Sequence, residues 1–504
     1  MSQIRKQSLI SSMVVYIGFA LGFVNTYLFA REGGFSKEEY GLTGIFIAIS
    51  SLMFSVANLG MTSYVNKFFP YYNDNLPKKK NDLLSWAVLV SLIGFSLVTI
   101  GGLYFKDLII QKFGGNSPQL IKYYYWLFPF GLGLTLYSII ESYAWQLKKS
   151  ILANYLREIQ FRLFTTFLIV LTTLGYLANF ETFIKIYSFT YLLVAFILII
   201  VLIVNGDLHF TLTPSIVSKK YFKKIVTLAT FVMGGNIVFT LSNVFDSLLI
   251  ASVLKDGLAA VAIYTLAQNI ASIVQAPQRG VISASIGTLS KAWKDKNMET
   301  INRVYQRSSI NQLIFSVGMF ALLWLNFTDG VLTFKLQTGY LDAKWIFFFI
   351  GFMRIIDMGT GVNAQIIQTS VYWRFEFFTG IILLLLTLPL NYIFTKFYFG
   401  IIGPAISNLI AFTIYNAIRY GFLKRKFNLD PFSINTLFTI AIGAVAYYIC
   451  YLLMDDKQGL IWLTIRSLTF ILLYVLGVLG LKLSPDIIPI WNTLLKRVGI
   501  KKET

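Results

Sequence analysis

Long apolar stretches follow one another along this chain of 504 residues, separated by short polar turns. Residues 8–29, 83–105, 310–333 and 434–454 are four examples. At 1.5 Å per residue, each stretch is long enough as a helix to cross the roughly 30 Å hydrocarbon core of a bilayer. The pattern therefore predicts a polytopic membrane protein, whose function is carried out within or across a membrane.

The apolar runs also decide the type of secondary structure. Strands of a membrane β-barrel alternate apolar and polar side chains over about ten residues, but residues 192–204 and 381–386 show no alternation. Because only helices and closed barrels satisfy their backbone in lipid, we expect an all-α protein with about 14 transmembrane helices. The expected spans are residues 8–29, 42–68, 83–105, 120–147, 153–178, 183–205, 225–253, 258–288, 309–333, 342–369, 376–396, 400–423, 434–454 and 460–482.

The basic residues predict how these spans are oriented. An even number of spans places both termini on one side of the membrane. The loops on that side and the termini together carry about 24 Lys and Arg residues, whereas the opposite loops carry about 9. Basic residues collect in cytoplasmic loops, so we expect both termini in the cytoplasm.

Composition narrows the function further. Charged residues make up only 13% of the chain, and its net charge of +20 is explained by the cytoplasmic loops, so no nucleic acid is expected as a partner. The single cysteine, Cys450, excludes an intrachain disulfide, and the single histidine, His209, excludes a histidine-based metal site. The chain has no Walker A sequence. We expect a protein without enzymatic activity, metal or cofactor.

A polar stretch at residues 206–224 separates the sixth expected span from the seventh, as a linker between two lobes would. We expect an N-lobe of helices 1–6 over residues 1–205 and a C-lobe of helices 7–12 over residues 225–426. Residues 427–504 would then form helices 13 and 14 and a cytoplasmic tail.

Charged side chains inside membrane spans are costly, and they are therefore candidates for function. Glu158 and Arg162 are spaced i,i+4 on one expected helix, which allows an ion pair. Glu141 is expected at about the same depth as Arg157 and Arg162. Glu141 with Arg157 or Arg162 forms either a structural cluster or part of a cationic inner cavity.

Two acidic residues are candidates for ion coupling. Arg354 and Asp357 are spaced i,i+3 near mid-membrane, and they form either a buried pair or a contact to substrate or ion. Asp246 has no partner nearby in the sequence. An unpaired carboxylate in a membrane is protonated or holds a cation, so Asp246 either couples transport to protons or sodium or pairs with another helix.

Arg279 follows Pro277, which removes a backbone donor and can kink the helix. The planar guanidinium of Arg279 can bind a phosphate; the alternative is that its side chain extends to the inner membrane interface.

Arg419 and Arg466 are expected at the interface. Amide side chains in the spans either join helices or bind sugar hydroxyls: Asn58, Asn236, Asn243, Gln268, Asn269, Asn363 and Gln365.

Two six-helix lobes, a cytoplasmic linker and a final helix pair resemble the multidrug/oligosaccharidyl-lipid/polysaccharide (MOP) exporter superfamily. The resemblance is carried by residues 8–29, Glu39-Tyr40-Gly41, Asn58-Leu59-Gly60 and Pro277-Gln278-Arg279. Within the superfamily, the chain is similar to the polysaccharide-biosynthesis (Wzx-type) flippases. The drug-efflux branch more usually carries an acidic residue in its first span, and residues 8–29 contain none.

The resemblance implies a V-shaped pair of lobes around a cationic cavity that opens alternately to each side of a bacterial inner membrane. The expected substrate is a polyprenyl-diphosphate-linked oligosaccharide, such as an O-antigen, capsule or exopolysaccharide repeat unit, moved from the inner to the outer leaflet. The diphosphate would contact Arg157, Arg162, Arg279 and Arg354, while the amides above would bind the sugar. Asp246 and Asp357 would serve ion coupling. The expected partners are this lipid-linked glycan, the bilayer and a polysaccharide polymerase complex.

Three alternatives stay open at this point. The chain could be a cation-coupled multidrug exporter or a flippase for the peptidoglycan lipid precursor. A membrane polysaccharide polymerase or ligase would need a catalytic acid near the outer face, where Asp107, Asp329, Asp342 and Asp455 are the candidates.

Overall fold

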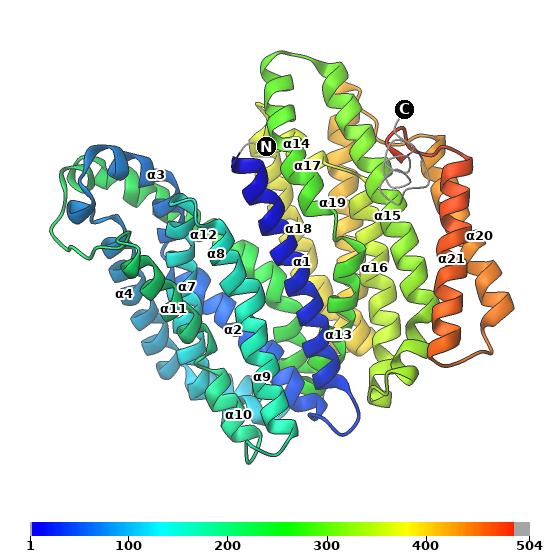
Figure 1. Cartoon of the computed structure of the whole chain (residues 1–504), viewed down its shortest axis with the longest axis horizontal. Coiled ribbons are helices and arrows are strands. Elements are labelled where there is room, and N and C mark those ends of the chain that lie inside the picture. Colours follow the sequence, from blue (N-terminus) through cyan, green and yellow to red (C-terminus); the bar gives the residue numbers. More distant parts are fainter. Residues whose placement is uncertain (1–2, 488–504) are drawn as a thin grey trace. The chain divides into compact units, whose positions relative to one another are not determined.

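The computed structural model describes residues 3–487, with side chains from residue 13 onward except Trp373. Its regular structure is helical, as the apolar runs predict (Figure 1). Within residues 3–487, ten helical stretches are long and apolar enough to cross a membrane. One of them, Arg374–Phe427, has 54 residues and contains two helices that pack against each other. The expected number of fourteen spans stays a prediction.

The chain divides into two compact units, the first ending at Ala262 and the second beginning at Ile263. The expected lobe boundaries near residues 205 and 225 stay a prediction. The helices of the first unit are α1 (Gln3–Ala30), α2 (Lys37–Ala57), α3 (Met61–Asn75), α4 (Leu83–Tyr104), α5 (Lys106–Phe113), α6 (Pro118–Lys122), α7 (Leu127–Gln146), α8 (Ser150–Tyr155), α9 (Phe161–Thr173), α10 (Phe180–Tyr187), α11 (Thr190–Val204) and α12 (Ile216–Val253), with a π-helical turn, η3 (Leu156–Gln160), between α8 and α9.

Helix α7 is central to the first unit, because it packs against α2, α3, α4 and α11. Its contact with α11 is especially close. A Cβ at Gly133 would lie only 2.4 Å from the backbone nitrogen of Leu192. Only glycine therefore lets the two backbones approach to this distance. The buried side chains of Phe130 and Tyr137 complete the packing around α7.

The expected span 42–68 is in fact two helices, α2 and α3. The chain turns between them at Leu59 and Gly60, whose φ angles are +46° and +75°. Asn58 stabilises the turn, because its side-chain amide donates to the Thr62 hydroxyl (3.0 Å) and its side-chain oxygen accepts from the Thr62 N–H (3.0 Å). A Cβ at Gly60 would lie 2.4 Å from the carbonyl oxygen of Ala229, so the turn also brings α12 against α3.

The expected linker at residues 206–224 is only partly a loop. Residues from Ile216 onward already belong to α12, which continues without interruption for 38 residues. Ser215 caps this helix by accepting a hydrogen bond from the backbone N–H of Ser218 (3.1 Å). Helix α12 packs against α2 and α3 within the first unit.

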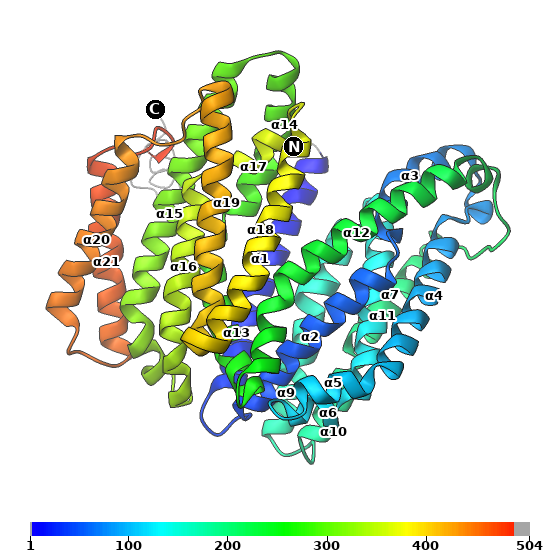
Figure 2. The same ribbon diagram turned by 180° about the vertical axis from the view of Figure 1, so that it is seen from behind.

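The second unit is organised around α15, which packs against α14, α16, α20 and α21. Helices α20 and α21 form a hairpin beside α15 (Figures 1 and 2). The tail expected in the cytoplasm, residues 488–504, lies outside the described residues. The helices are α13 (Gly257–Val274), which begins in the first unit, α14 (Gln278–Lys294), α15 (Met298–Thr333), α16 (Ala343–Gly359), α17 (Asn363–Gln368), α18 (Trp373–Ile393), α19 (Gly403–Phe427), α20 (Ile434–Met454) and α21 (Leu460–Gly480).

Arg466 fastens the α20–α21 hairpin to α15. It was expected at the membrane interface, but the structure buries it. Its guanidinium donates to the carbonyls of Met454 (2.9 Å) and Lys457 (2.5 Å) and lies 3.6 Å from the carboxylate of Asp329. The other oxygen of Asp329 accepts from the Gly459 N–H (3.0 Å). The position of Arg466 thus follows from a partner on another helix, which local sequence does not reveal.

Asp207, in the loop after α11, joins three connections between helices of the first unit. Its carboxylate accepts hydrogen bonds from Lys149 and, at 3.2 Å, from Lys78. Its backbone carbonyl accepts from the Tyr143 hydroxyl (3.2 Å). The hydrogen bond from Lys149 and then that from Lys78 hold the pKa of Asp207 below its usual value.

We expect Asp207→Asn to lower the free energy of unfolding at pH 7 by on the order of 1 kcal/mol, because two partly exposed ion pairs are lost. A carboxylate with a lowered folded-state pKa stabilises the protein above its unfolded pKa of about 3.9. This contribution is lost as the pH falls through the folded-state pKa. The difference in apparent Tm between the wild type and the variant, measured in detergent, should therefore be constant near neutrality and shrink below about pH 4.

Asp74→Asn is the matched control, since Asp74 is an exposed acid on α3 that forms no ion pair with another described residue. It should leave the apparent Tm unchanged. Equal Tm values for wild type and Asp207→Asn at pH 7 would show that this contact does not stabilise the unit.

Candidate functional site

The break between α13 and α14 places Gln278 and Arg279 at the start of α14, as Pro277 predicts. The Gln278 amide donates to the carboxylate of Asp357 on α16 (2.8 Å). At the other end of α14, the Trp293 indole donates to the carbonyl of Ile366 (3.0 Å). These two bonds fix the rotation of α14 about its axis.

Arg279 projects from a different side of α14. Consecutive residues of an α-helix are about 100° apart, so Arg279 points to one side of α16 when Gln278 points towards it. Its side chain is exposed, and no hydrogen bond or ion pair joins it to another residue of the described part of the chain. Arg279 is therefore a cation that is positioned by its neighbours and still available to an anion.

Asp357 is the start of a buried polar network within the second unit. Besides Gln278, its carboxylate accepts a hydrogen bond from the Asn416 amide (3.2 Å). The side-chain oxygen of Asn416 accepts from Asn363 (3.0 Å) and from the Thr360 hydroxyl (3.1 Å). The structure thus brings together two of the expected site residues, Asp357 and Asn363. Their common neighbour Asn416 was missed.

Arg354 lies one turn before Asp357 on α16 and is half-buried. The spacing predicts an ion pair between them, but the hydrogen bonds of Asp357 described above come from neutral amides. The role of Asp357 in ion coupling stays a prediction.

A second buried group joins α18 to α19 and was not expected. Glu376 accepts hydrogen bonds from Arg419, at 2.9 Å for Nε and through a closer contact with Nη2, and from the Tyr415 hydroxyl (3.3 Å). The Arg419 guanidinium also lies 3.6 Å from the centre of the Tyr415 ring. Arg419 was expected at the membrane interface, and the structure instead buries it against this carboxylate. Glu376 is the only acidic residue of α18 and α19, a signal that sequence reasoning overlooked.

In the first unit, two ion pairs lie on neighbouring turns. Arg157 donates to Glu141 (2.8 Å), and Arg162 donates to Glu158 (2.5 Å), the pair that the i,i+4 spacing predicts. Glu141 is buried, whereas the side chain of Arg157 is 45% exposed. Arg157 can therefore still meet an anion on its open side. Arg162 also donates to the carbonyl of Glu158 (2.8 Å), which leaves it less available.

Arg162 lies flat against α1. A Cβ at Gly18 would stand 2.7 Å from its Nη1, and one at Gly22 would stand 3.2 Å from its Nε. Asn25, one turn further on, donates to the Arg162 carbonyl (3.0 Å) and accepts from the Thr166 hydroxyl (2.5 Å). Gly18 and Gly22 in α1 make this contact possible. Their role could not be predicted without knowing which helix packs against them.

The remaining expected residues are spread over several helices. Asn236, Asn243 and Asp246 lie on α12, where Asn243 donates to its own helix at the Phe239 carbonyl (2.7 Å) and Asp246 is buried. Asn58 is engaged in the α2–α3 turn. Gln268 and Asn269 on α13 and Gln365 on α17 are half-buried. Their roles stay predictions. No three His, Cys, Asp or Glu side chains among residues 13–487 are close enough to hold a metal ion.

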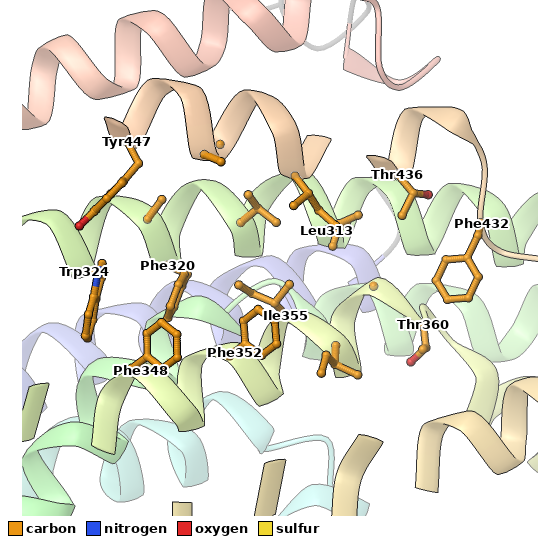
Figure 3. A pocket seen from close by; sticks show the side chains of 17 residues that line it. Leu313, Phe320, Trp324, Phe348, Phe352, Ile355, Thr360, Phe432, Thr436 and Tyr447 are labelled. Atoms are coloured by element: carbon orange, nitrogen blue, oxygen red, sulfur yellow. The ribbon is translucent and has the colours of Figure 1, made fainter. Parts of the chain in front are cut away.

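An apolar pocket of about 480 Å³ lies within the second unit, between α15, α16 and α20 (Figure 3). Trp324, Phe348 and Tyr447 surround one end of it, and Thr360 and Thr436 stand near the other. Such a lining suits a hydrocarbon chain. The sequence did not predict this pocket, because it forms from three helices.

Comparisons with known proteins place this geometry in context. The sequence profile of a family described as "Polysaccharide biosynthesis protein" matches residues 4–293. No curated protein of similar sequence was found.

Several solved structures share the fold. The lipid II flippase MurJ in an inward closed conformation is 19% identical over 95% of this chain and 100% of its own, with a TM-score of 0.74. An inward-facing multidrug resistance MATE transporter of the MOP superfamily is 15% identical over 81% of this chain and 94% of its own, with a TM-score of 0.63. A MOP superfamily transporter from Pyrococcus furiosus is 15% identical over 84% and 96%, with a TM-score of 0.55.

We expect Arg419→Met to destabilise the protein by about 3–5 kcal/mol, because it leaves the Glu376 carboxylate buried without a cation. The double variant Glu376→Gln/Arg419→Met removes both charges and should recover most of the loss. Apparent Tm and the monodisperse yield in detergent measure both effects. Arg425→Met, an exposed basic residue on the same helix, is the control and should behave as wild type. A single variant no worse than the double variant would mean that the pair is dispensable.

Proposed function

We propose that this chain, which belongs to the polysaccharide biosynthesis protein family, moves a polyprenyl-diphosphate-linked oligosaccharide from the inner to the outer leaflet of a bacterial inner membrane. Its many apolar helices make it a multi-pass membrane protein, and its fold is that of MOP transporters. The orientation proposed from the basic loops has both termini in the cytoplasm.

The observation that carries the proposal is the exposed, uncompensated guanidinium of Arg279. Along the helices, Arg279 lies about 33 Å from Gly257, and this length is close to that of the hydrocarbon core. With Gly257 at the outer surface, Arg279 is level with the inner-leaflet headgroups, where the diphosphate of a lipid-linked glycan would lie.

Other groups fit the remaining parts of such a substrate. The open side of Arg157 offers a second cation, with Arg162 and Arg354 as weaker candidates. Sugar hydroxyls would bond to amides, for which Asn236, Gln268 and Gln365 are half-buried and accessible. Asn58, Asn243, Asn269 and Asn363 complete the proposed set. The apolar pocket beside α20 supports the proposal because it suits part of a polyprenyl chain.

Transport would follow alternating access between inward-open and outward-open states. Transport is directional only if the substrate binds the two states differently, and a proton or sodium gradient could supply the bias. Asp246 is the carboxylate that we propose for this coupling, with Asp357 as the second. A polysaccharide polymerase complex on the outer side is the proposed recipient of the product.

The alternatives differ in measurable ways. For a polymerase or ligase, the candidate acid Asp329 is already bound to Arg466 and to the Gly459 N–H, which speaks against a catalytic role. Deleting the gene should make lipid-linked intermediates accumulate with their heads in the cytoplasm, as mass analysis of the lipids would show. Lost synthesis without such accumulation would favour an enzyme, and accumulation of the peptidoglycan precursor would favour that flippase.

We expect Arg279→Ala to lower the rate of transfer of a fluorescent undecaprenyl-diphosphate-linked oligosaccharide in proteoliposomes at least tenfold. Arg279→Lys should retain part of the rate, because lysine keeps the charge but not the two-pronged geometry of arginine. Arg425→Ala removes one exposed positive charge elsewhere and should have no effect. Transfer by Arg279→Ala at the wild-type rate would refute the assignment of Arg279.

Asp246→Asn tests ion coupling separately. If Asp246 carries the ion, transfer by the wild type should fall when the proton or sodium gradient is collapsed, and transfer by the variant should be slow with or without the gradient. The measurement is the initial rate in proteoliposomes with an imposed gradient and with the matching ionophore. A variant that is fast and still responds to the gradient would remove Asp246 from the mechanism.

A further inference from the structure

A second cavity, of about 600 Å³, lies in the first unit between α3, α4 and the first five turns of α12. Figure 2 shows α12 running along α3, with α4 on the far side of α3. Its lining is mostly apolar and includes Trp86 on α4 and Phe222, Val226 and Met233 on α12. The side chains of Phe222 and Val226 are also exposed, so the cavity is open to the surroundings of the protein.

The start of α12 carries four lysines, Lys219, Lys220, Lys223 and Lys224. All four are exposed, and none forms an ion pair with a carboxylate among the described residues. Lys220 and Lys224 lie 5.6 and 5.7 Å from the centre of the Tyr221 ring. Lys219 lines the cavity itself. The mouth of an apolar cavity thus bears positive charge that no described carboxylate balances.

These turns of α12 form an amphipathic helix. At about 100° per residue, the four lysines fall within an arc of about 140°. Val217, Tyr221, Ile225 and Leu228 fall within a neighbouring arc of about 80°, and Lys224 lies at the border between the two arcs. Those four residues belong to or pack against the hydrophobic core of the first unit. The apolar face is therefore buried inside the protein while the lysines stay exposed, and a lysine cluster beside a membrane attracts anionic lipids.

Hydrogen bonds hold the cavity in shape. Asp82, at the start of α4, accepts from the Ser215 N–H (2.9 Å) and from the Ser218 hydroxyl (2.7 Å). The Tyr72 hydroxyl of α3 lies 2.7 Å from that of Ser218. All three helices are therefore tied together at one end of the cavity. Trp86 lines the cavity, and its buried indole N–H has no hydrogen-bond partner among the described residues.

We infer that this cavity binds an anionic phospholipid of the cytoplasmic leaflet. One acyl chain lies between α3, α4 and α12, and the phosphate is held by Lys219 and Lys223, the two lysines nearest the cavity face of the helix. The occupant is anionic because the four uncompensated lysines favour a negative headgroup over a zwitterionic one. The inference does not depend on the proposed substrate, because it concerns a lipid that resides in the protein.

Bromine quenches tryptophan fluorescence at short range, so Trp86 can report the bound chain. We would reconstitute the full chain in nanodiscs with brominated phosphatidylglycerol or, at the same mole fraction, brominated phosphatidylethanolamine. The contribution of Trp86 is the difference between wild type and Trp86→Phe. We expect phosphatidylglycerol to quench this contribution several-fold more strongly at low mole fraction.

Lys219→Gln/Lys223→Gln should abolish the preference for phosphatidylglycerol. Lys291→Gln/Lys294→Gln, which removes two exposed charges at the end of α14, should preserve it. Val226→Phe fills the cavity from an exposed position and should reduce quenching of Trp86 by both lipids. Size-exclusion profiles and helical circular dichroism confirm that each variant is folded.

Equal quenching by the two lipids in the wild type would overturn the inference, as would a loss of preference in the α14 control. Displacement of phosphatidylglycerol by equimolar undecaprenyl phosphate would also overturn it, because the cavity would then be a substrate site. No lipid-linked oligosaccharide is present in this assay, so its outcome is separate from that of the transfer measurements.

Discussion

A charged side chain inside this protein must find its partner within the chain, because lipid supplies neither water nor hydrogen bonds. This constraint explains two buried ion pairs of the second unit. Glu376 is enclosed by Arg419 and Tyr415, and Arg466 is enclosed by Asp329 and the carbonyls of the α20–α21 turn. In each case an ion pair joins two neighbouring helices, α18 with α19 and α15 with α21. Charge compensation therefore fixes which helices are neighbours.

The same constraint gives meaning to charges that are not compensated. Arg279 is oriented by the bond between Gln278 and Asp357, yet its own guanidinium meets no described carboxylate. Arg157 has only one partner and keeps an open side. We propose that these two guanidinium groups bind an anionic lipid substrate, a role compatible with the family to which the chain belongs.

Apolar patterning was sufficient to predict most helices, because a span is a local property. Residues 434–454 were predicted with the bounds that α20 shows, and 83–105 differs from α4 by one residue. The breaks between helices were harder to predict. Pro277 indicates the break between α13 and α14, but the turn at Gly60 depends on its contact with α12. Pairs within one helix, such as Glu158 and Arg162, follow from spacing. Pairs between helices, such as Glu376 and Arg419, depend on packing that a single sequence does not reveal.

The length of α12 connects the fold with both proposed lipid sites. Its 38 residues extend for about 57 Å, well beyond a 30 Å hydrocarbon core. In the orientation proposed above, the surplus would place its basic turns at the cytoplasmic surface, the level also proposed for Arg279. The two sites would nevertheless favour different lipids. Lysines act as mobile point charges that suit any anionic headgroup, whereas the planar fork of an arginine selects phosphate oxygens by geometry. Residue type can therefore separate a resident phospholipid from a diphosphate substrate at the same depth.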